Sequence, residues 1–132
     1  MKIYCGTDII EVERIKDAIF NVEGFKEKVF SKEEIKIGEQ KKEKTRYEYY
    51  AGRFAAKEAI YKAVSNIKND FCFWEVEIIG EKENKNRPAI TFFNKELETL
   101  KNCMKIDVDV SISHIKEYAV AMAVIKDNRD EV

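Results

Sequence analysis

Residues 45–65 constrain the fold most, because they form a helix-length segment that is apolar around most of the helix circumference. Other elements have to bury such a helix on several sides. Only one glycine, Gly52, interrupts the segment, and Thr45 followed by Glu48 has the form of a capping box at its start. The sequence therefore predicts a long central helix packed inside the molecule.

Strand patterns occur on both sides of this helix in the sequence. The clearest one spans 106–113, where apolar residues alternate with aspartates and serines and one face would be buried. Helices interleaved with strands and short turns predict an α+β fold, with a mainly antiparallel sheet packed against the central helix. The other expected segments are strands at 2–7, 71–79, 89–93 and 118–125, helices from 8 to about 20, from 31 to about 39 and at 95–102, and connectors at 24–30, 40–44, 66–70 and 80–88.

Composition limits the kinds of protein that the chain can be. With 132 residues we expect a single domain at 1–126, followed by a polar tail at 127–132. A net charge of −1 argues against a nucleic-acid binder, and the longest uncharged apolar run, 118–125, is too short to span a bilayer. The three cysteines are widely spaced, so we expect reduced core residues of a cytoplasmic protein. A single histidine excludes a multi-histidine metal centre.

Asp8 and Glu58 are carboxylates in apolar surroundings. Asp8 follows the apolar strand 2–7, and Glu58 lies within the central helix. A carboxylate in such a place is costly unless a cation or a metal pairs with it. Two carboxylates from separate elements, with Arg53, Lys57 and Lys62 nearby, indicate a divalent cation that holds a phosphorylated ligand.

Simpler explanations exist for both carboxylates. Asp8 and Glu11 have the form of a capping box, which needs no function and is the stronger explanation from the residues alone. Glu58 could pair with Lys62 one helical turn away, which stabilises a helix by about 0.2–0.5 kcal/mol. That gain is too small to offset the dehydration of a carboxylate, so a metal site is favoured for Glu58. Lys62 could contact a phosphate, protonate a leaving group or neutralise Glu58.

Three sequence blocks resemble one known family, the holo-[acyl-carrier-protein] synthases, which are small AcpS-type 4′-phosphopantetheinyl transferases. The blocks are GTDI at 6–9, GRFAAKEA at 52–59, and SISH at 111–114 with KEYA at 116–119. The central octapeptide is specific, and the three blocks follow one another in the order and at the spacing of that family. The resemblance extends over essentially the whole chain.

The resemblance implies a particular reaction. The enzyme would transfer the 4′-phosphopantetheine arm of coenzyme A to a serine of apo acyl carrier protein in fatty acid biosynthesis, releasing adenosine 3′,5′-bisphosphate. Asp8 and Glu58 would hold Mg²⁺ against the pyrophosphate, with Lys62 as the third catalytic residue. A water held by a carboxylate would accept the serine proton, and most of the catalysis would be positioning and electrostatics.

The resemblance also implies how coenzyme A and the partners are bound. Lys44, Arg46 and Arg53 would help to hold the phosphates of coenzyme A. His114 would approach the 3′-phosphoadenosine end of a coenzyme A that is bound mainly to a neighbouring subunit, because the family forms homotrimers with active sites between subunits. Arg14 would meet the acidic carrier protein. The simpler explanations are ordinary surface charge and a turn histidine without a role.

The chain departs from the family pattern at three places. The loop 66–70 contains no glycine where the family usually has a glycine-rich loop, although Asn66 and Asn69 tolerate left-handed backbone. Tyr61 replaces a smaller residue, and Ile115 stands where a hydroxyl usually follows the histidine. The glycine-free loop and Ile115 support one competing hypothesis, a binding module without turnover. The other is a structural oligomeric domain whose buried charges are merely paired.

Overall fold

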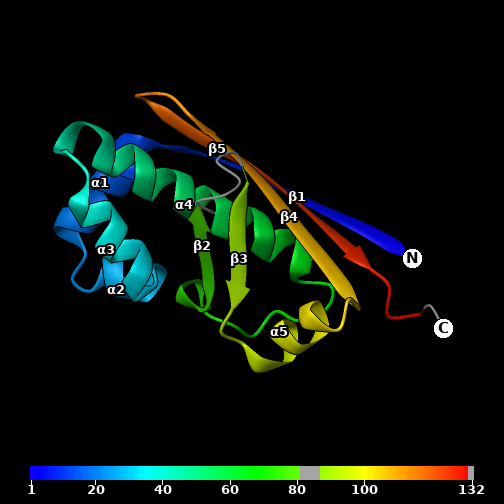
Figure 1. Ribbon diagram of the computed structural model, residues 1–132. Coiled ribbons are helices and arrows are strands. Elements are labelled where there is room, and N and C mark those ends of the chain that lie inside the picture. The colour runs from blue at the N-terminus through cyan, green and yellow to red at the C-terminus, as the bar shows by residue number, and fades with distance from the viewer. Residues whose placement is uncertain (81–86, 131–132) are drawn as a thin grey trace.

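The long helix α4 (Glu43–Val64) lies against a three-stranded sheet in the computed structural model, with α1, α2 and α3 gathered near one end (Figure 1). The structure describes residues 1–80 and 87–130, so parts of the expected turn at 80–88 and of the tail at 127–132 lie outside the described residues. The other elements are β1 (Lys2–Glu11), α1 (Val12–Asn21), α2 (Phe25–Val29), α3 (Lys32–Gln40), the 3-10 turn η1 (Phe73–Glu75), β2 (Val76–Gly80), β3 (Pro88–Phe92), α5 (Lys95–Asn102), β4 (Ile106–His114) and β5 (Tyr118–Asp127).

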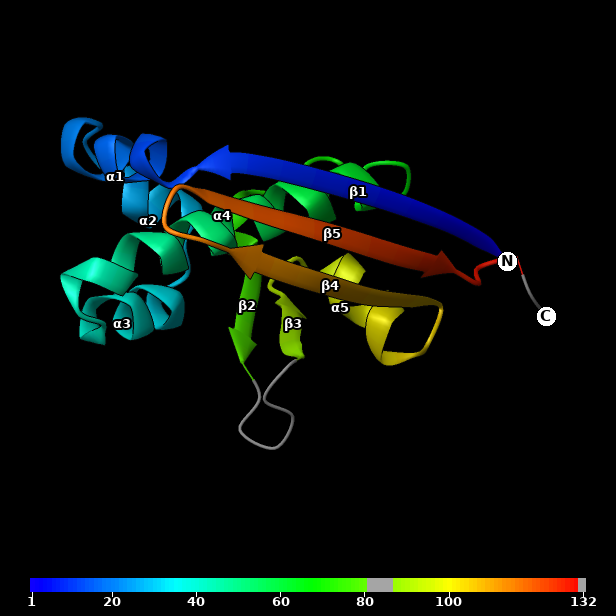
Figure 2. The same ribbon diagram turned by 90° about the horizontal axis from the view of Figure 1, so that it is seen from above.

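The three-stranded sheet has the order β1-β5-β4 and is antiparallel throughout, and β2 and β3 form a separate antiparallel pair. Viewed from above, the sheet covers α4 along its length (Figure 2). The predicted α+β fold with an antiparallel sheet against a long central helix is confirmed. The helices at 31–39 and 95–102 and the strand at 106–113 are also confirmed, within one residue at either end.

Small residues allow α4 to lie close to the sheet. Three inward side chains of β5 are alanines, Ala119, Ala121 and Ala123, all at most 1% exposed. Alanines of α4 that are fully buried form the facing surface: Ala51, Ala55, Ala56, Ala59 and Ala63. Short side chains on both surfaces reduce the distance between helix and sheet, which brings residues of β1 within reach of side chains on α4.

Gly6 is the closest point of this contact, and its replacement gives a testable prediction. A Cβ at Gly6 would lie 2.0 Å from the carbonyl oxygen of Ala59, so Gly6→Ala has to push β1 away from α4. We expect a loss of roughly 1–3 kcal/mol in the free energy of unfolding, measured by urea denaturation. Gly80→Ala is the control, since nothing lies within 4 Å of its added Cβ. Equal stability of both variants would contradict the close contact.

The predicted capping box at Asp8 is wrong. β1 continues to Glu11, Asp8 is paired with Ala121 of β5, and the first helix begins only at Val12. The ladder between β1 and β5 extends over the whole segment and pairs the backbone groups that β1 turns toward β5. A local cap pattern is therefore overridden by a strand that is distant in the sequence.

Two further helix boundaries differ from the prediction. α4 begins at Glu43 with Lys42 as its N-cap, so Thr45 lies within the helix and its predicted capping box is wrong. The expected connector at 24–30 contains the short helix α2. The capping box at Ser31 is confirmed, with Ser31 N donating to Glu34 Oε1 at 2.8 Å and Glu34 N donating to Ser31 Oγ at 3.2 Å.

The strand expected at 71–79 begins late, and the cysteines are not in the core. Residues Phe73–Glu75 form a 3-10 turn before β2 starts at Val76.

The prediction of buried cysteines is wrong, since Cys5, Cys72 and Cys103 are all free thiols and all exposed. Apolar neighbours in the sequence do not fix the side to which a residue points, and Cys5 lies on the outward face of β1.

Candidate active site

The structure brings Asp8, Glu58 and Lys62 together. Strand alternation turns Asp8 of β1 toward α4, where its side chain is 18% exposed. Lys62 Nζ lies 3.5 Å from Asp8 Oδ1 and donates a hydrogen bond to the carbonyl oxygen of Thr7 at 2.9 Å. Glu58 is half-buried one turn before Lys62 on α4. The three predicted catalytic residues therefore form one cluster between β1 and α4.

Glu58 has an unfavourable electrostatic environment. Burial raises the pKa of its carboxyl group, the charge of Asp8 raises it further, and Lys62 opposes both effects. The ion pair that the structure records for Lys62 is with Asp8, not with Glu58. A simple Glu58–Lys62 pair therefore does not account for this carboxylate, and a second cation beside it would relieve the repulsion.

The donor set of this cluster fits Mg²⁺. Among the described residues, no group of three or more histidine, cysteine, aspartate or glutamate side chains could hold a metal by itself. Mg²⁺ usually takes one or two protein carboxylates and completes its octahedron with waters and substrate phosphates. Asp8 and Glu58 supply that number of carboxylates and leave the remaining positions to a phosphorylated ligand.

Aromatic side chains form a wall beside Glu58. Phe54 lies one turn before Glu58 on α4, and its ring centroid is 6.3 Å from that of Phe25 and 6.1 Å from that of Phe73. Tyr61 extends the wall, with its ring centroid 5.9 Å from that of Phe73. Helical spacing placed Phe54 near Glu58, but no sequence signal pointed to Phe25 and Phe73, which come from α2 and η1.

A second cluster surrounds a hollow of about 590 Å³ on another side of α4. Arg53 and His114, both expected to bind coenzyme A, line it. The guanidinium of Arg53 lies 4.7 Å from the ring centroid of Tyr49, and its Nε donates to the carbonyl oxygen of Ile78 at 2.9 Å. His114 Nδ1 is 3.2 Å from Glu48 Oε1. Cationic and polar groups therefore converge on this hollow.

The other predicted phosphate ligands lie near this hollow in the sequence but do not line it. Arg46 Nη2 donates to the carbonyl oxygens of Glu39 at 3.2 Å and of Lys41 at 3.1 Å, which satisfies the end of α3. Lys44 is exposed on the first turn of α4. Lys41, which was not among the predicted phosphate ligands, does line the hollow.

The two clusters lie on different faces of one subunit. Arg53 and Glu58 are five residues apart on α4, which separates their directions by roughly 140° around the helix axis. A single ligand on this chain would have to pass around the helix to touch both. The hollow and the carboxylate cluster are therefore not placed to bind neighbouring groups of one ligand on the same chain.

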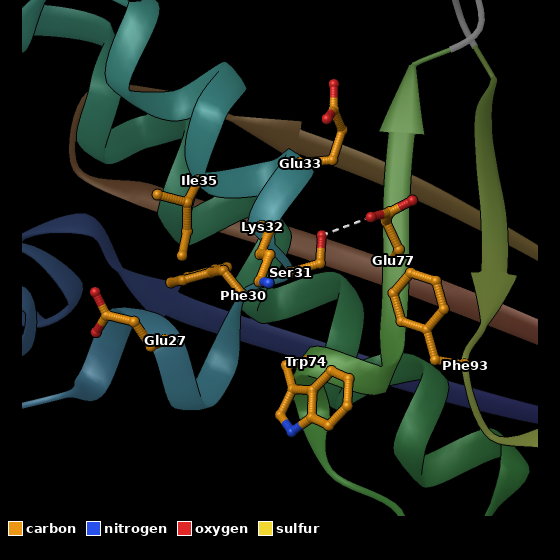
Figure 3. A pocket seen from close by; sticks show the side chains of 9 residues that line it. All are labelled: Glu27, Phe30, Ser31, Lys32, Glu33, Ile35, Trp74, Glu77 and Phe93. Carbon is orange, nitrogen blue, oxygen red and sulfur yellow. Dashed lines mark hydrogen bonds between the residues drawn. The ribbon is translucent and has the colours of Figure 1, made fainter.

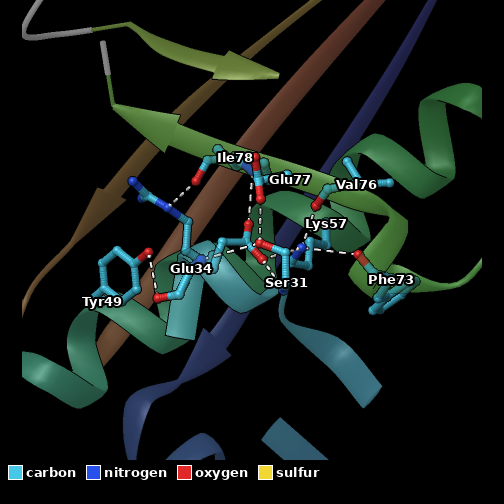
Figure 4. Close-up of polar contacts among 9 residues, drawn as sticks. Ser31, Glu34, Tyr49, Lys57, Phe73, Val76, Glu77 and Ile78 are labelled. Carbon is cyan, nitrogen blue, oxygen red and sulfur yellow. Dashed lines mark hydrogen bonds and ion pairs between the residues drawn. The ribbon is translucent and has the colours of Figure 1, made fainter. Parts of the chain in front are cut away.

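Lys57 does not belong to either cluster, contrary to its expected place beside the phosphorylated ligand. It is fully buried, its Nζ lies 2.7 Å from Glu34 Oε1, and it donates to the carbonyl oxygens of Phe73 and Val76 (Figure 4). Glu34 Oε2 accepts from Ile78 N at 2.8 Å. The pair joins α3, α4 and β2, so its role is structural.

An apolar hollow of about 600 Å³ lies between the α2–α3 segment and β2–β3 (Figure 3). Exposed Trp74 and Phe93 line it, and their ring centroids are 6.3 Å apart. Three glutamates, Glu27, Glu33 and Glu77, also line it. None of the predicted site residues belongs to this hollow.

Comparisons with known proteins show the family of the chain. The family model of the 4′-phosphopantetheinyl transferase superfamily matches residues 4–123. The holo-[acyl-carrier-protein] synthase of Ruminiclostridium cellulolyticum is 43% identical over 127 residues, 95% of this chain and 92% of that protein. The one from Fusobacterium nucleatum is 40% identical over 126 residues, 95% of this chain and 99% of that protein.

Solved structures show the same fold. The holo-(acyl-carrier-protein) synthase of Bacillus anthracis in complex with CoA (3′,5′-ADP) has a TM-score of 0.74 and 32% identity, covering 94% of this chain and 96% of that one. The enzyme of Helicobacter pylori in complex with coenzyme A has a TM-score of 0.72 and 30% identity, covering 92% and 99%. The chain therefore belongs to the 4′-phosphopantetheinyl transferase superfamily, and within it to the holo-[acyl-carrier-protein] synthases. The family that the three sequence blocks indicated is therefore confirmed.

Proposed function

We propose that this protein transfers the 4′-phosphopantetheine arm of coenzyme A to a serine of apo acyl carrier protein, with Mg²⁺ held by Asp8 and Glu58. The observation that carries the proposal is the convergence of these two carboxylates with Lys62 between β1 and α4. Relatives named for this activity, and their complexes with coenzyme A, support it.

The residues of this cluster can perform the steps of the reaction. The serine oxygen forms a bond to the phosphorus that carries the pantetheine arm, and the bond from that phosphorus to the 3′,5′-bisphosphate oxygen breaks. The Glu58 carboxylate is suited to accept the serine proton through a water that it holds. The ammonium of Lys62 stabilises the leaving phosphate. Mg²⁺, when bound, would supply positive charge against the pyrophosphate.

The outer face of the sheet supports the proposal of a homotrimer with active sites between subunits. This face carries exposed apolar side chains at Ile9, Val120 and Met122, which are 67%, 42% and 50% exposed. No other described element covers this face (Figures 1 and 2). His114 lies at its edge, in a small hollow that Ile9 and Val120 also line. A neighbouring subunit on this face would bury the apolar residues and bring the Arg53–His114 hollow toward a second carboxylate cluster.

Met122→Glu tests this arrangement. A charge in the middle of the apolar face is expected to dissociate the trimer to monomers in analytical ultracentrifugation and to lower transfer by at least about tenfold, because each site would lose its neighbour. Met104→Glu is the control, since Met104 is 81% exposed and lies in the turn between α5 and β4, outside the apolar face. A monomeric wild type with full activity would contradict the shared site.

The remaining parts of the proposal concern the partners and the compartment. Arg14 is exposed on α1, where an acidic carrier protein could dock beside the aromatic wall. The three free cysteines fit the reducing cytoplasm, where fatty acid biosynthesis would use the product. Among the described residues, no helix is long and apolar enough to cross a membrane.

Titration of the protein with coenzyme A, once in the presence of Mg²⁺ and once in the presence of EDTA, tests whether coenzyme A binds and whether its binding depends on the metal. We expect Mg²⁺ to tighten binding to the wild type and to have little effect on Asp8→Asn. Metal-independent binding of equal strength in both proteins would contradict the Asp8–Glu58 metal site. A folded protein that does not bind coenzyme A at all would favour the structural oligomeric domain.

A further inference from the structure

The loop after α4 extends the face of the helix that carries Glu58 and Lys62. Ser65 follows them at helical spacing, and its Oγ donates to the carbonyl oxygen of Lys62 at 3.0 Å. The backbone N–H groups of Ile67 and Lys68 both donate to the carbonyl oxygen of Val64, at 2.7 and 3.0 Å. The loop therefore begins as a tightened continuation of the helix, directly after the turn that carries Lys62.

This loop makes its turn without a left-handed residue. Neither Asn66 nor Asn69 has a positive φ, because Met104 is the only non-glycine residue with a positive φ among those described. The tolerance of asparagine for left-handed backbone is therefore not used. No position of the loop therefore requires glycine.

Tyr61 provides the main side-chain anchor of the loop. Its hydroxyl donates to the carbonyl oxygen of Asn69 at 3.1 Å, across the loop from the helix. Its ring centroid is 5.4 Å from that of Phe71 and 5.9 Å from that of Phe73, so packing fixes the ring on both sides. Tyr61 lies between Glu58 and Lys62 in the sequence, which links the loop to the helix turn that carries the site.

An ion pair network holds the outer side of the same loop. Lys68 Nζ lies 2.8 Å from Asp70 Oδ1 and 3.1 Å from Glu96 Oε2 of α5. These groups are at the surface, so salt screens their attraction. The hydroxyl of Tyr61 is the side-chain contact that joins α4 to the far end of the loop, at Asn69.

We propose that Tyr61 is a positioning residue that holds the glycine-free loop 65–70 beside the Glu58–Lys62 face and thereby determines how tightly the phosphates of coenzyme A are bound. This inference rests on the proposed function, because it takes coenzyme A as the ligand. Tyr61 acts through the loop backbone and not on the reacting atoms. Loss of its hydroxyl should therefore weaken binding and leave the chemical step unchanged.

Tyr61→Phe tests the inference, since it keeps the ring and removes only the hydrogen bond. We expect the dissociation constant of coenzyme A with Mg²⁺, measured without carrier protein, to rise roughly three- to tenfold, as does KM, with kcat within about twofold. Hydrogen exchange of the peptide that spans 65–70 should become faster. Tyr4→Phe is the control, because Tyr4 packs against the main core and its hydroxyl makes no recorded hydrogen bond with the described residues.

The outcomes separate this inference from the proposed function. Unchanged coenzyme A affinity and unchanged loop exchange in Tyr61→Phe would overturn the positioning role, as would a fall in kcat at constant KM. A wild type that binds coenzyme A but transfers nothing would overturn the proposed function, while the binding and exchange measurements would still decide the role of Tyr61.

Discussion

Replacing Glu58 by glutamine is expected to lower phosphopantetheine transfer by at least about 10²-fold and to raise the stability of the ligand-free protein. Transfer falls because the amide can neither accept the serine proton nor provide a charged ligand for Mg²⁺. Stability rises because the folded protein holds an ionised Glu58 at a disadvantage, through burial and the charge of Asp8. A residue that is merely structural would lose stability on replacement.

The pH dependence of that stabilisation follows from the direction of the pKa shift. The folded-state pKa of Glu58 is raised above the ordinary value of 4.5, so the folded protein binds this proton more tightly than the unfolded chain. The wild type therefore loses stability relative to Glu58→Gln as the pH rises through the folded pKa. Below pH 4.5 the difference should disappear.

Thermal unfolding of wild type and Glu58→Gln from pH 4 to pH 8 measures this effect, with Glu43→Gln as the control. Glu43 is exposed on the first turn of the same helix, so its replacement should show no such trend. Coenzyme A with Mg²⁺ should raise the melting temperature of the wild type more than that of Glu58→Gln. A Glu58→Gln protein that is less stable at pH 7 would contradict this electrostatic description of the site.

Replacing Lys57 by methionine is expected to lower the free energy of unfolding by about 3–5 kcal/mol. The substitution leaves the Glu34 carboxylate without its cation in a site where both side chains are fully buried. Neutralising the second partner removes that penalty, so Lys57→Met with Glu34→Gln should recover at least about 1 kcal/mol. Glutamine still offers an oxygen to the N–H of Ser31 or Ile78.

Urea denaturation of the two single variants and the double variant gives the coupling energy of this pair. Lys36→Met is the matched control, because Lys36 is exposed on α3. A loss below about 1 kcal/mol for Lys57→Met would show that the pair does not hold α3, α4 and β2 together. A double variant less stable than either single variant would also contradict the prediction.

The sequence predicted the members of the carboxylate cluster better than their local structure. Asp8 and Glu58 stand out because their apolar neighbours are visible in the sequence itself. The capping pattern at Asp8 was misleading, since the pairing of β1 with β5 joins residues more than a hundred positions apart. Local preferences are weak beside a full ladder of backbone hydrogen bonds.

Other features depend on tertiary contacts that no short pattern reveals. A lysine is normally a surface residue, but Lys57 is fully buried because it pairs with Glu34. Glu34 comes from another helix, so the sequence around Lys57 does not reveal the pair. Phe25 and Phe73 reach the wall beside Glu58 from segments on either side of α4 in the sequence. Exposed Cys5 shows the same limit, because the side to which a strand residue points follows from strand register.

Intact-protein mass spectrometry of an apo acyl carrier protein tests the central claim most directly. The carrier is incubated with this protein, coenzyme A and Mg²⁺, and in parallel with EDTA in place of Mg²⁺. The proposed function predicts that the carrier gains the mass of one phosphopantetheine arm, and only in the presence of the metal. A folded protein that binds coenzyme A but leaves several carrier proteins unchanged would contradict it and would favour a binding module without turnover.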